Sequence, residues 1–303
     1  MNLRSKIRAN APAWLFSTHL RRKRDKYKKY AQQITEEVLD YFQTFQNPSQ
    51  EQQEVIDYVA KNGLDFVPYE FTKQYKQKNV KVYTDKSSKM HYVMHNGKKL
   101  YFNRRYDKNY VQYMYNELLI EQDQNSPHLY ETDDFFVKTG DVVADVGAAE
   151  GIFALSVIDK VEKIYLFECE SEWIEALQKT FEPYKDKVEI IEKYVSDKDE
   201  GNNITLDTFF ADKKIDFVKA DIEGAEIQLL AGARKFLTSS VPNKIVLCTY
   251  HRQTDAENIE SILRHNSYNT AYSKGYLLNY ISRFFEPPYF RRGVIRGEKK
   301  CEV

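Results

Sequence analysis

Cysteine and long apolar runs are both scarce in this sequence of 303 residues. The three cysteines, Cys169, Cys248 and Cys301, show neither paired spacing nor the spacing of metal ligands, so nothing requires an oxidising compartment. No apolar run reaches the roughly 18 residues of a membrane-spanning helix, and the N-terminus lacks the apolar core of a signal peptide. We therefore expect a cytoplasmic protein.

The formal net charge of the chain is zero, but basic and acidic residues are unevenly distributed along it. Residues 1–30 contain ten Lys or Arg and one acidic residue, Asp25, so the rest of the chain is acidic. An acidic body argues against nucleic acid as the main substrate. The basic segment predicts an anionic partner, such as the inner face of a membrane that Trp14-Leu15-Phe16 could enter. The alternative is a helix that docks on its own domain.

Aromatic residues, by contrast, are abundant, and 23 of them are tyrosines. Tyrosine-rich clefts suit sugars and other ligands with one apolar and one polar side, although tyrosines also serve in ordinary cores. The composition leaves both uses open.

Residues 1–130 predict an extension made of a basic helix, a hairpin and a further helix. The favoured turn Asn96-Gly97 separates the two strands of the hairpin. The predicted segments are a helix within 1–45, a linker or turn at Asn47–Gln53, short helices in 54–78, strands Val80–Asp85, Met90–His95 and Lys99–Arg104, and a helix Asn109–Asp123.

Residues 131–303 predict a second unit, in which strands and helices alternate from Thr139 onward. Such alternation is typical of a parallel sheet with helices on both faces, whose ligands bind beyond the carboxyl ends of the strands. The predicted strands are Val142–Gly147, Lys163–Cys169, Val188–Val195, Ile215–Asp221, Lys244–Tyr250, Tyr268–Ser273 and Tyr289–Arg296. The predicted helices are Ile152–Val161, Glu172–Phe181, Ala225–Leu237 and Ala256–His265.

The first of these strands ends in Asp145-Val-Gly147-Ala148-Ala149-Glu150-Gly151. Its small residues let a ligand approach the backbone closely, and its carboxylate can hold polar groups of that ligand. A nicotinamide dinucleotide site needs G-x-G-x-x-G so that a helix N-terminus can meet the pyrophosphate. Asp145 takes the place of the first glycine and would repel a pyrophosphate. An acidic turn suits S-adenosylmethionine, which carries a sulfonium and an ammonium group.

Carboxylates also stand at the ends of two further strands. Glu168 follows Gly147 by 21 residues, where it can accept hydrogen bonds from both hydroxyls of a ribose. Asp221 and Glu223 end the fourth strand, where they are placed for chemistry. Glu226 is predicted to favour the following helix N-terminus electrostatically.

Three segments together resemble the FkbM family of methyltransferases: D-V-G-A-A-E-G-I-F, L-F-E-C-E and V-K-A-D-I-E-G-A-E. The resemblance covers about residues 139–251, and Ala149 and Cys169 replace the usual Asn and Pro. It implies a class I methyltransferase Rossmann-like sheet, α/β and mostly parallel with seven strands, and O-methylation of a sugar hydroxyl in a glycan, glycolipid or natural product. The implied cofactor is S-adenosylmethionine. The residues predicted to bind it are Asp145, Gly147, Ala148, Ala149, Glu150, Gly151, Glu168, Cys169, Val195, Ser196 and Asp221.

His251, after the fifth strand, reaches the same rim and could take the proton from an acceptor hydroxyl. Asp221 is the alternative base, and Glu223 is predicted to orient the acceptor or a metal. Asp221, Glu223 and His251 could also hold a divalent cation, a question that the spacing leaves open. His251 as a purely structural residue is the remaining interpretation.

Polar and aromatic residues between Gln122 and Tyr130 predict a lid or substrate wall, or simply a loop before the first strand of the sheet. Two alternative functions also remain. One is a nucleotide-dependent sugar-modifying oxidoreductase, and the other is a non-catalytic adaptor that docks on membranes.

Overall fold

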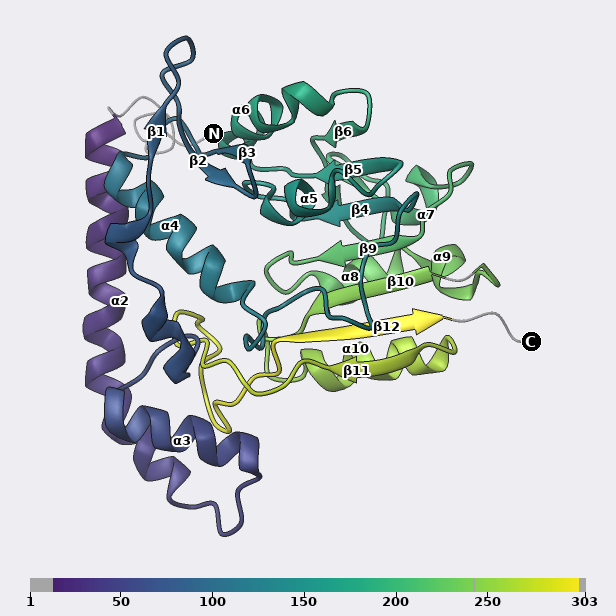
Figure 1. The fold of residues 1–303 in the computed structure, drawn as a ribbon. Coiled ribbons are helices and arrows are strands. Elements are labelled where there is room, and N and C mark those ends of the chain that lie inside the picture. The colour runs from purple at the N-terminus through teal and green to yellow at the C-terminus, as the bar shows by residue number, and fades with distance from the viewer. Residues whose placement is uncertain (1–12, 242, 300–303) are drawn as a thin grey trace.

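A seven-stranded sheet forms the centre of the molecule in the computed structural model, which describes residues 13–241 and 243–299 (Figure 1). The basic residues before Ala13, the side chains of Trp14 and Leu15, and Cys301 lie outside the described part. The strand order is β11-β12-β10-β9-β4-β5-β6, and β12 runs antiparallel to both of its neighbours while the other pairings are parallel. The predicted fold class is confirmed.

The strands of this sheet are short and largely buried. β4 is buried along its whole length, as expected of a central parallel strand that is covered on both faces. The bounds are β4 Val142–Val146, β5 Lys163–Phe167, β6 Val188–Ile191, β9 Phe217–Ala220, β10 Asn243–Cys248, β11 Asn269–Tyr272 and β12 Val294–Lys299.

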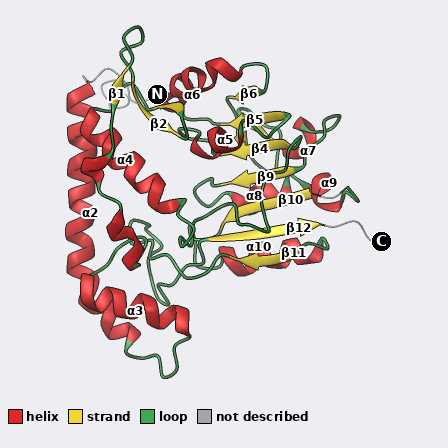
Figure 2. Ribbon diagram, in the orientation of Figure 1, coloured by secondary structure: helices red, strands yellow, loops and turns green. Residues whose placement is uncertain are grey.

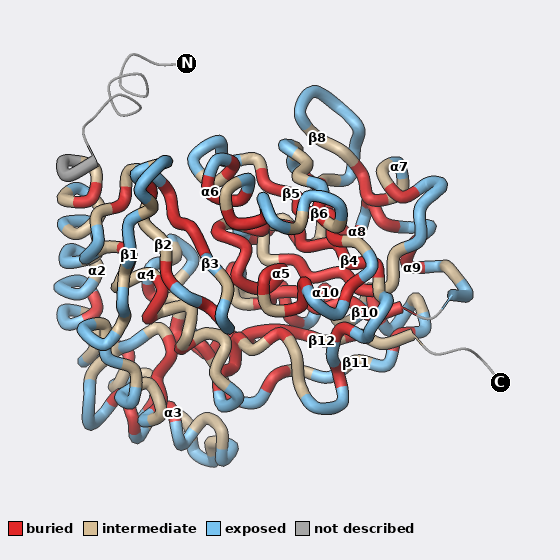
Figure 3. The backbone as a smooth tube through the Cα atoms, turned by 45° about the horizontal axis from the view of Figure 1, so that its top comes forward, coloured by how far each residue is buried: buried red, intermediate tan, exposed pale blue. Residues whose placement is uncertain are grey.

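Alternate residues of the strands enter two different cores. Val143 packs in a cluster with Phe153 of α5 and Leu177 of α6, whereas Ala144 packs in a cluster with Leu229 of α8 and Ile259 of α10. Buried positions therefore concentrate along the strands (Figure 3). The helices of this unit are α5 Ile152–Val157, α6 Ser171–Phe181, α7 Leu206–Phe209, α8 Glu226–Ala231, α9 Arg234–Thr238 and α10 Asp255–His265, with a 3-10 turn η3 at Glu182–Tyr184.

The chain changes direction across the sheet between β4 and β9. It runs outward from β4 through β5 to β6, and later returns to place β9 on the other side of β4. Such a switch point leaves a crevice at the carboxyl ends of the two strands, which is where open α/β sheets bind their ligands.

The N-terminal extension stands at that carboxyl edge, where α2 and α4 lie (Figure 2). The hairpin turn is confirmed, because Asn96 and Gly97 both have positive φ, as a two-residue type I′ turn requires. The elements are α2 Ala13–Phe42, α3 Gln50–Asn62, the 3-10 turns η1 Glu70–Gln74 and η2 Gln77–Asn79, β1 Tyr83–Thr84, β2 His91–His95, β3 Lys98–Tyr101 and α4 Lys108–Glu121.

The basic helix α2 docks on its own protein. Phe16 stacks on Tyr106 with 6.2 Å between ring centroids, and Arg21 pairs with Asp107 at 2.6 Å. Contact of this segment with an anionic membrane stays a prediction. None of the described helices has the length and apolar composition needed to cross a membrane.

Several predicted boundaries were wrong. The predicted linker at Asn47–Gln53 already contains the start of α3, because Ser49 and Gln52 form a capping box. The predicted strand at Val80–Asp85 shrinks to β1, and the last predicted strand lies later, at β12.

Two predicted elements are divided in two. The predicted helix Ala225–Leu237 breaks at Gly232, where the Ser196 carbonyl leaves no room for a side chain. The predicted strand Val188–Val195 ends at Ile191, and Tyr194–Val195 forms β7, which pairs with β8 (Asn203–Ile204) outside the main sheet.

The turn from β4 into α5 is tightly constrained. A Cβ on Gly147 would collide with the backbone oxygen of Asp221, so only glycine lets the ends of β4 and β9 approach this closely. Ala149 has a φ of 47°, in the left-handed region that is unfavourable for alanine and better tolerated by asparagine.

We expect Ala149→Asn to raise the free energy of unfolding by about 1 kcal/mol, because asparagine adopts the left-handed conformation at lower cost. Chemical denaturation of the ligand-free protein measures it. Ala211→Asn is the control at an exposed turn position without positive φ, and it should change little. Equal stability changes in the two variants would contradict strain at residue 149.

Candidate active site

A buried ion pair joins the two central strands at the switch point. Asp145 of β4 and Lys219 of β9 are paired in the sheet register, and their charged atoms lie 2.9 Å apart. Lys219 also donates to the backbone oxygen of Gly147 at 2.9 Å. The sequence assigned Asp145 a free negative charge, whereas the structure neutralises it with Lys219. Direct contact of Asp145 with a ligand stays a prediction, because the carboxylate is fully buried.

Glu168 organises the neighbouring loop. Its carboxylate accepts hydrogen bonds from the backbone of Ala149 at 2.8 Å and of Cys169 and Glu170 at 2.7 Å each. This side chain therefore ties the end of β5 to the turn after β4. Contact of the Glu168 oxygens with the hydroxyls of a ribose stays a prediction.

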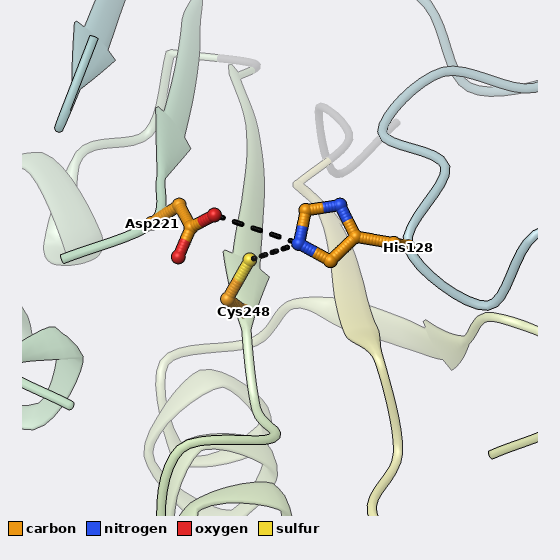
Figure 4. Close-up of side chains that lie close together, drawn as sticks. All are labelled: His128, Asp221 and Cys248. Carbon is orange, nitrogen blue, oxygen red and sulfur yellow. Dashed lines mark hydrogen bonds and ion pairs between the residues drawn. The ribbon is translucent and has the colours of Figure 1, made fainter. Parts of the chain in front are cut away.

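Asp221 is the centre of the cluster beyond β9. Tyr130 donates to its Oδ2 at 3.1 Å and Tyr250 donates to its Oδ1 at 3.3 Å. His128 approaches the same carboxylate at 3.5 Å and also lies 3.7 Å from the sulfur of Cys248 (Figure 4). Burial alone would raise the pKa of Asp221, but the hydrogen bond from His128 and the charge of His251 hold it well below the ordinary value. Asp221 is therefore anionic and a weak base.

His251 lies among three carboxylates and is only 7% exposed. Its Nε2 lies 3.4 Å from Asp221 and 3.9 Å from Glu223, and its Nδ1 lies 3.3 Å from Glu226. Burial would lower the pKa of His251, but Glu226 and Asp221 outweigh it and raise that pKa to about 9. The imidazole is consequently protonated at neutral pH.

Glu223 and Glu226 have different environments although they are three residues apart. The Glu223 side chain is 96% exposed, on a residue whose φ of 57° is strained for a non-glycine. Glu226 is 1% exposed and accepts a hydrogen bond from the backbone of Ile222 at 2.9 Å. Glu226 therefore holds the turn and orients His251, while Glu223 faces the solvent side of the site.

Two groups of side chains bring possible metal ligands within 4.8 Å of one another. One contains Asp221, Glu226 and His251, and the other contains His128, Asp221 and Cys248. In the first group, both ring nitrogens of His251 and one oxygen of Glu226 are buried without a hydrogen-bond partner. Glu226 takes the place that the sequence gave to Glu223 in such a set.

Some of the other residues predicted to bind the cofactor lie in the turn after β4, and others lie away from it. Glu150 is buried in the turn, and burial raises its pKa to about 7. Ala148 is buried and Gly151 precedes α5, so both belong to the same turn. Val195 packs in the core and Ser196 lies against Gly232, so their contact with a cofactor stays a prediction.

Several residues of the cluster were not predicted as site residues. His128 and Tyr130 come from the loop after α4, which supports the interpretation of this segment as a wall of the site. Tyr250 and Lys219 adjoin residues that the sequence had singled out. The signal for His128 and Tyr130 was the polar and aromatic composition of their segment, and the signal for Tyr250 and Lys219 was their position at predicted strand ends.

A cavity of about 720 Å³ lies between α2 and α4, on the same side as these strand ends. Glu121 lines it and interacts electrostatically with Asp221, and Lys23 lines it and interacts with Glu223. Its volume is typical of small-molecule sites. Five tyrosines contribute to its wall: Tyr27, Tyr58, Tyr110, Tyr113 and Tyr280.

Comparison with protein families gives one match. Residues 189–270 match the methyltransferase FkbM domain, which confirms the resemblance seen in the sequence. The match supports methyl transfer rather than a dinucleotide-dependent oxidation or a non-catalytic adaptor. A comparison with curated proteins found no significant match.

Solved structures with similarity to this chain include three methyltransferases. Precorrin-6y C5,15-methyltransferase from Geobacter metallireducens is 12% identical, with 54% of this chain and 82% of that chain covered and a TM-score of 0.38. An rRNA methylase from Streptococcus thermophilus is 13% identical, with 55% and 90% covered and a TM-score of 0.37. The tRNA m1G37 methyltransferase from M. jannaschii is 13% identical, with 74% and 55% covered and a TM-score of 0.41.

We expect Glu226→Gln to lower the pKa of His251 from about 9 toward the ordinary value of 6.5, because the change removes the charge nearest to Nδ1. An NMR titration of the imidazole measures it. Glu257→Gln, an exposed change on α10, is the control and should leave the titration as it is. An unchanged titration in Glu226→Gln would show that other groups hold the proton.

Proposed function

We propose that the chain is an S-adenosylmethionine-dependent methyltransferase of the FkbM type, and that it methylates a hydroxyl group of a sugar in a glycan, glycolipid or natural product. One observation carries the proposal: a cavity walled by tyrosines is linked to the Asp221–His251 cluster through Phe66, which lines the cavity and contacts the ring of Tyr250, a donor to Asp221. Tyrosine faces pack against the apolar face of a sugar ring while their hydroxyls bond to its polar edge. The histidine of that cluster can receive the proton that a hydroxyl loses on methylation.

The cofactor supplies a methyl group on a sulfonium. The turn after β4 and Glu168, which accepts a hydrogen bond from the backbone of Ala149, would hold the cofactor, and Glu168 would accept hydrogen bonds from its ribose hydroxyls. Asp221, fixed by the hydroxyls of Tyr130 and Tyr250, would separate the cofactor from the acceptor. Most of the rate enhancement then comes from holding the acceptor oxygen in line with the methyl group.

His251 takes the hydroxyl proton at Nε2, the nitrogen on the side of Asp221 and Glu223. Glu226 orients the ring through Nδ1, as a carboxylate does in other acid–base pairs that contain histidine. Only the unprotonated fraction of His251 can act as a base. Because its pKa is about 9, that fraction grows with pH throughout the neutral range.

A divalent cation is the alternative occupant of the cluster. Two carboxylates and an imidazole from Asp221, Glu226 and His251 suit a cation such as Mn²⁺, which would replace the proton on His251. In that arrangement His251 orients the cation and does not act as the base. The effect of a chelator separates the two arrangements.

The test of the proposed function is methyl transfer from labelled S-adenosylmethionine to a panel of free and lipid-linked sugars, with EDTA or with added Mn²⁺. We expect label on a sugar oxygen, and a rate that rises about tenfold per pH unit up to about pH 9. His251→Gln should lower turnover by roughly 10²–10⁴-fold, whereas the exposed control His265→Gln should not.

Three outcomes would count against this scheme. Label on nitrogen, carbon or nucleic acid would contradict the proposed acceptor. A rate that is flat above mildly acidic pH would transfer the role of base from His251 to Glu223. Loss of activity in EDTA, restored by Mn²⁺, would make His251 a ligand of the cation.

We expect Glu168→Gln to weaken binding of S-adenosylmethionine by about 1.5–3 kcal/mol, because hydrogen bonds to a charged acceptor are stronger than those to an amide. Calorimetry on the isolated protein measures the affinity. The matched control is Glu170→Gln, which removes an exposed charge two residues away. Equal affinities in all three proteins would remove Glu168 from the cofactor site.

A further inference from the structure

The cavity between α2 and α4 is rich in positive charge as well as in tyrosine. Lys23 and Arg24 are neighbours on one turn of α2, Lys28 lies one turn later, and all three line the cavity. A fourth cation, Lys73, is engaged by Glu70 at 2.7 Å. The three α2 cations therefore give one wall of the cavity its charge.

These cations have few partners of their own. The Arg24 guanidinium lies 4.8 Å above the Tyr113 ring, and its buried Nε has no hydrogen-bond partner. The one ion pair recorded for Arg24, with Asp25, is long at 3.4 Å. Within residues 13–241 and 243–299, no ion pair is recorded for Lys23 or Lys28. Lys23 attracts Glu223, and Lys28 attracts Asp65 and Glu117, without forming an ion pair in the described residues, so both can still bind a ligand.

Three acids, Asp65, Glu117 and Glu121, also line the cavity, but burial weakens their effect. Burial raises the pKa of Glu117 to about 7, so this side chain is partly neutral at physiological pH. It raises the pKa of Asp65 and Glu121 as well. The cations therefore lie on the α2 wall of the cavity, and the acids lie on α4 and on the segment after α3.

The cavity is linked to the reacting groups through Phe66, which lines it and lies 5.5 Å from the Tyr250 ring, and Tyr250 donates to Asp221. Lys23 interacts electrostatically with Glu223, and Glu121 interacts with Asp221. An anion held by α2 would leave a ring attached to it among the tyrosines that line the cavity.

We infer that this cavity is the acceptor site and that the acceptor is a sugar carrying a phosphate group, held by Lys23, Arg24 and Lys28. The inference rests on the proposed function. A phosphate is favoured over a carboxylate because three cations on one helix match a dianion, and because arginine presents several donors to phosphate oxygens.

Calorimetry on protein loaded with S-adenosylhomocysteine tests the inference directly. The probes are the 1-phosphates of glucose, galactose and mannose, a uridine diphosphate sugar, the free hexoses, and glucuronate. We expect at least one phosphorylated sugar to bind at least tenfold more tightly than its free hexose. Arg24→Gln/Lys28→Gln should weaken that binding about tenfold or more, with the affinity for S-adenosylhomocysteine unchanged.

The control is Lys26→Gln/Lys29→Gln, which removes two exposed charges of the same helix outside the cavity wall. It should bind phosphorylated sugars as the wild type does. Lys28→Gln alone, an exposed change, serves if the double variant does not fold. Equal losses in the cavity and control variants would overturn the inference, as would tighter binding of glucuronate or no preference for phosphate.

The failure of this inference differs from the failure of the proposed function. Methylation of a neutral sugar with an unchanged KM in Arg24→Gln/Lys28→Gln would overturn the phosphate-bearing acceptor and leave the methyltransferase as proposed. Phosphate-dependent binding without any methylated sugar would overturn the proposed function, because the binding assay measures the cavity without turnover.

Discussion

The buried pair of Asp145 and Lys219 is the interaction on which the site depends. It joins the two strands at the switch point, and Lys219 continues to the Gly147 carbonyl, so one charge fixes the strand ends and the turn between them. Removing one partner of such a pair leaves an uncompensated buried charge and typically costs about 3–5 kcal/mol of stability. The pair therefore holds the two strand ends in place. The pair also neutralises Asp145, which leaves Asp221 and Glu168 as the carboxylates that organise the neighbouring loops.

The site is completed by parts of the chain that are remote in sequence. Tyr130 and His128 precede the sheet, and Tyr250 and His251 follow β10, yet all four converge on Asp221 from β9. The N-terminal extension adds the cavity through α2 and α4, which are tied together where Arg21 pairs with the Asp107 cap of α4. The sheet thus supplies the cluster around Asp221, and the extension supplies most of the wall of the cavity.

Electrostatics in this cluster come from an excess of carboxylates around one imidazole. Asp221, Glu226 and Glu223 together raise the pKa of His251, and the protonated ring in turn helps to keep Asp221 ionised. A proton on His251 satisfies these carboxylates, and a metal cation at the same place would satisfy them as well. Among these carboxylates Glu226 contributes most to the raised pKa of His251, because it is buried and cannot exchange the imidazole for water.

The sequence by itself determined the sheet, the hairpin turn at Asn96-Gly97 and the motifs at the strand ends, because each depends on neighbouring residues and on local periodicity. The capping box of α3 was equally local and was missed. Only the tertiary structure decided that Lys219 neutralises Asp145, that Gly232 breaks the helix against Ser196, and that His128 and Tyr130 reach Asp221. The physical reason is that burial, ion pairing and pKa depend on which distant segments meet, and the contact of Tyr130 with Asp221 joins positions 91 residues apart.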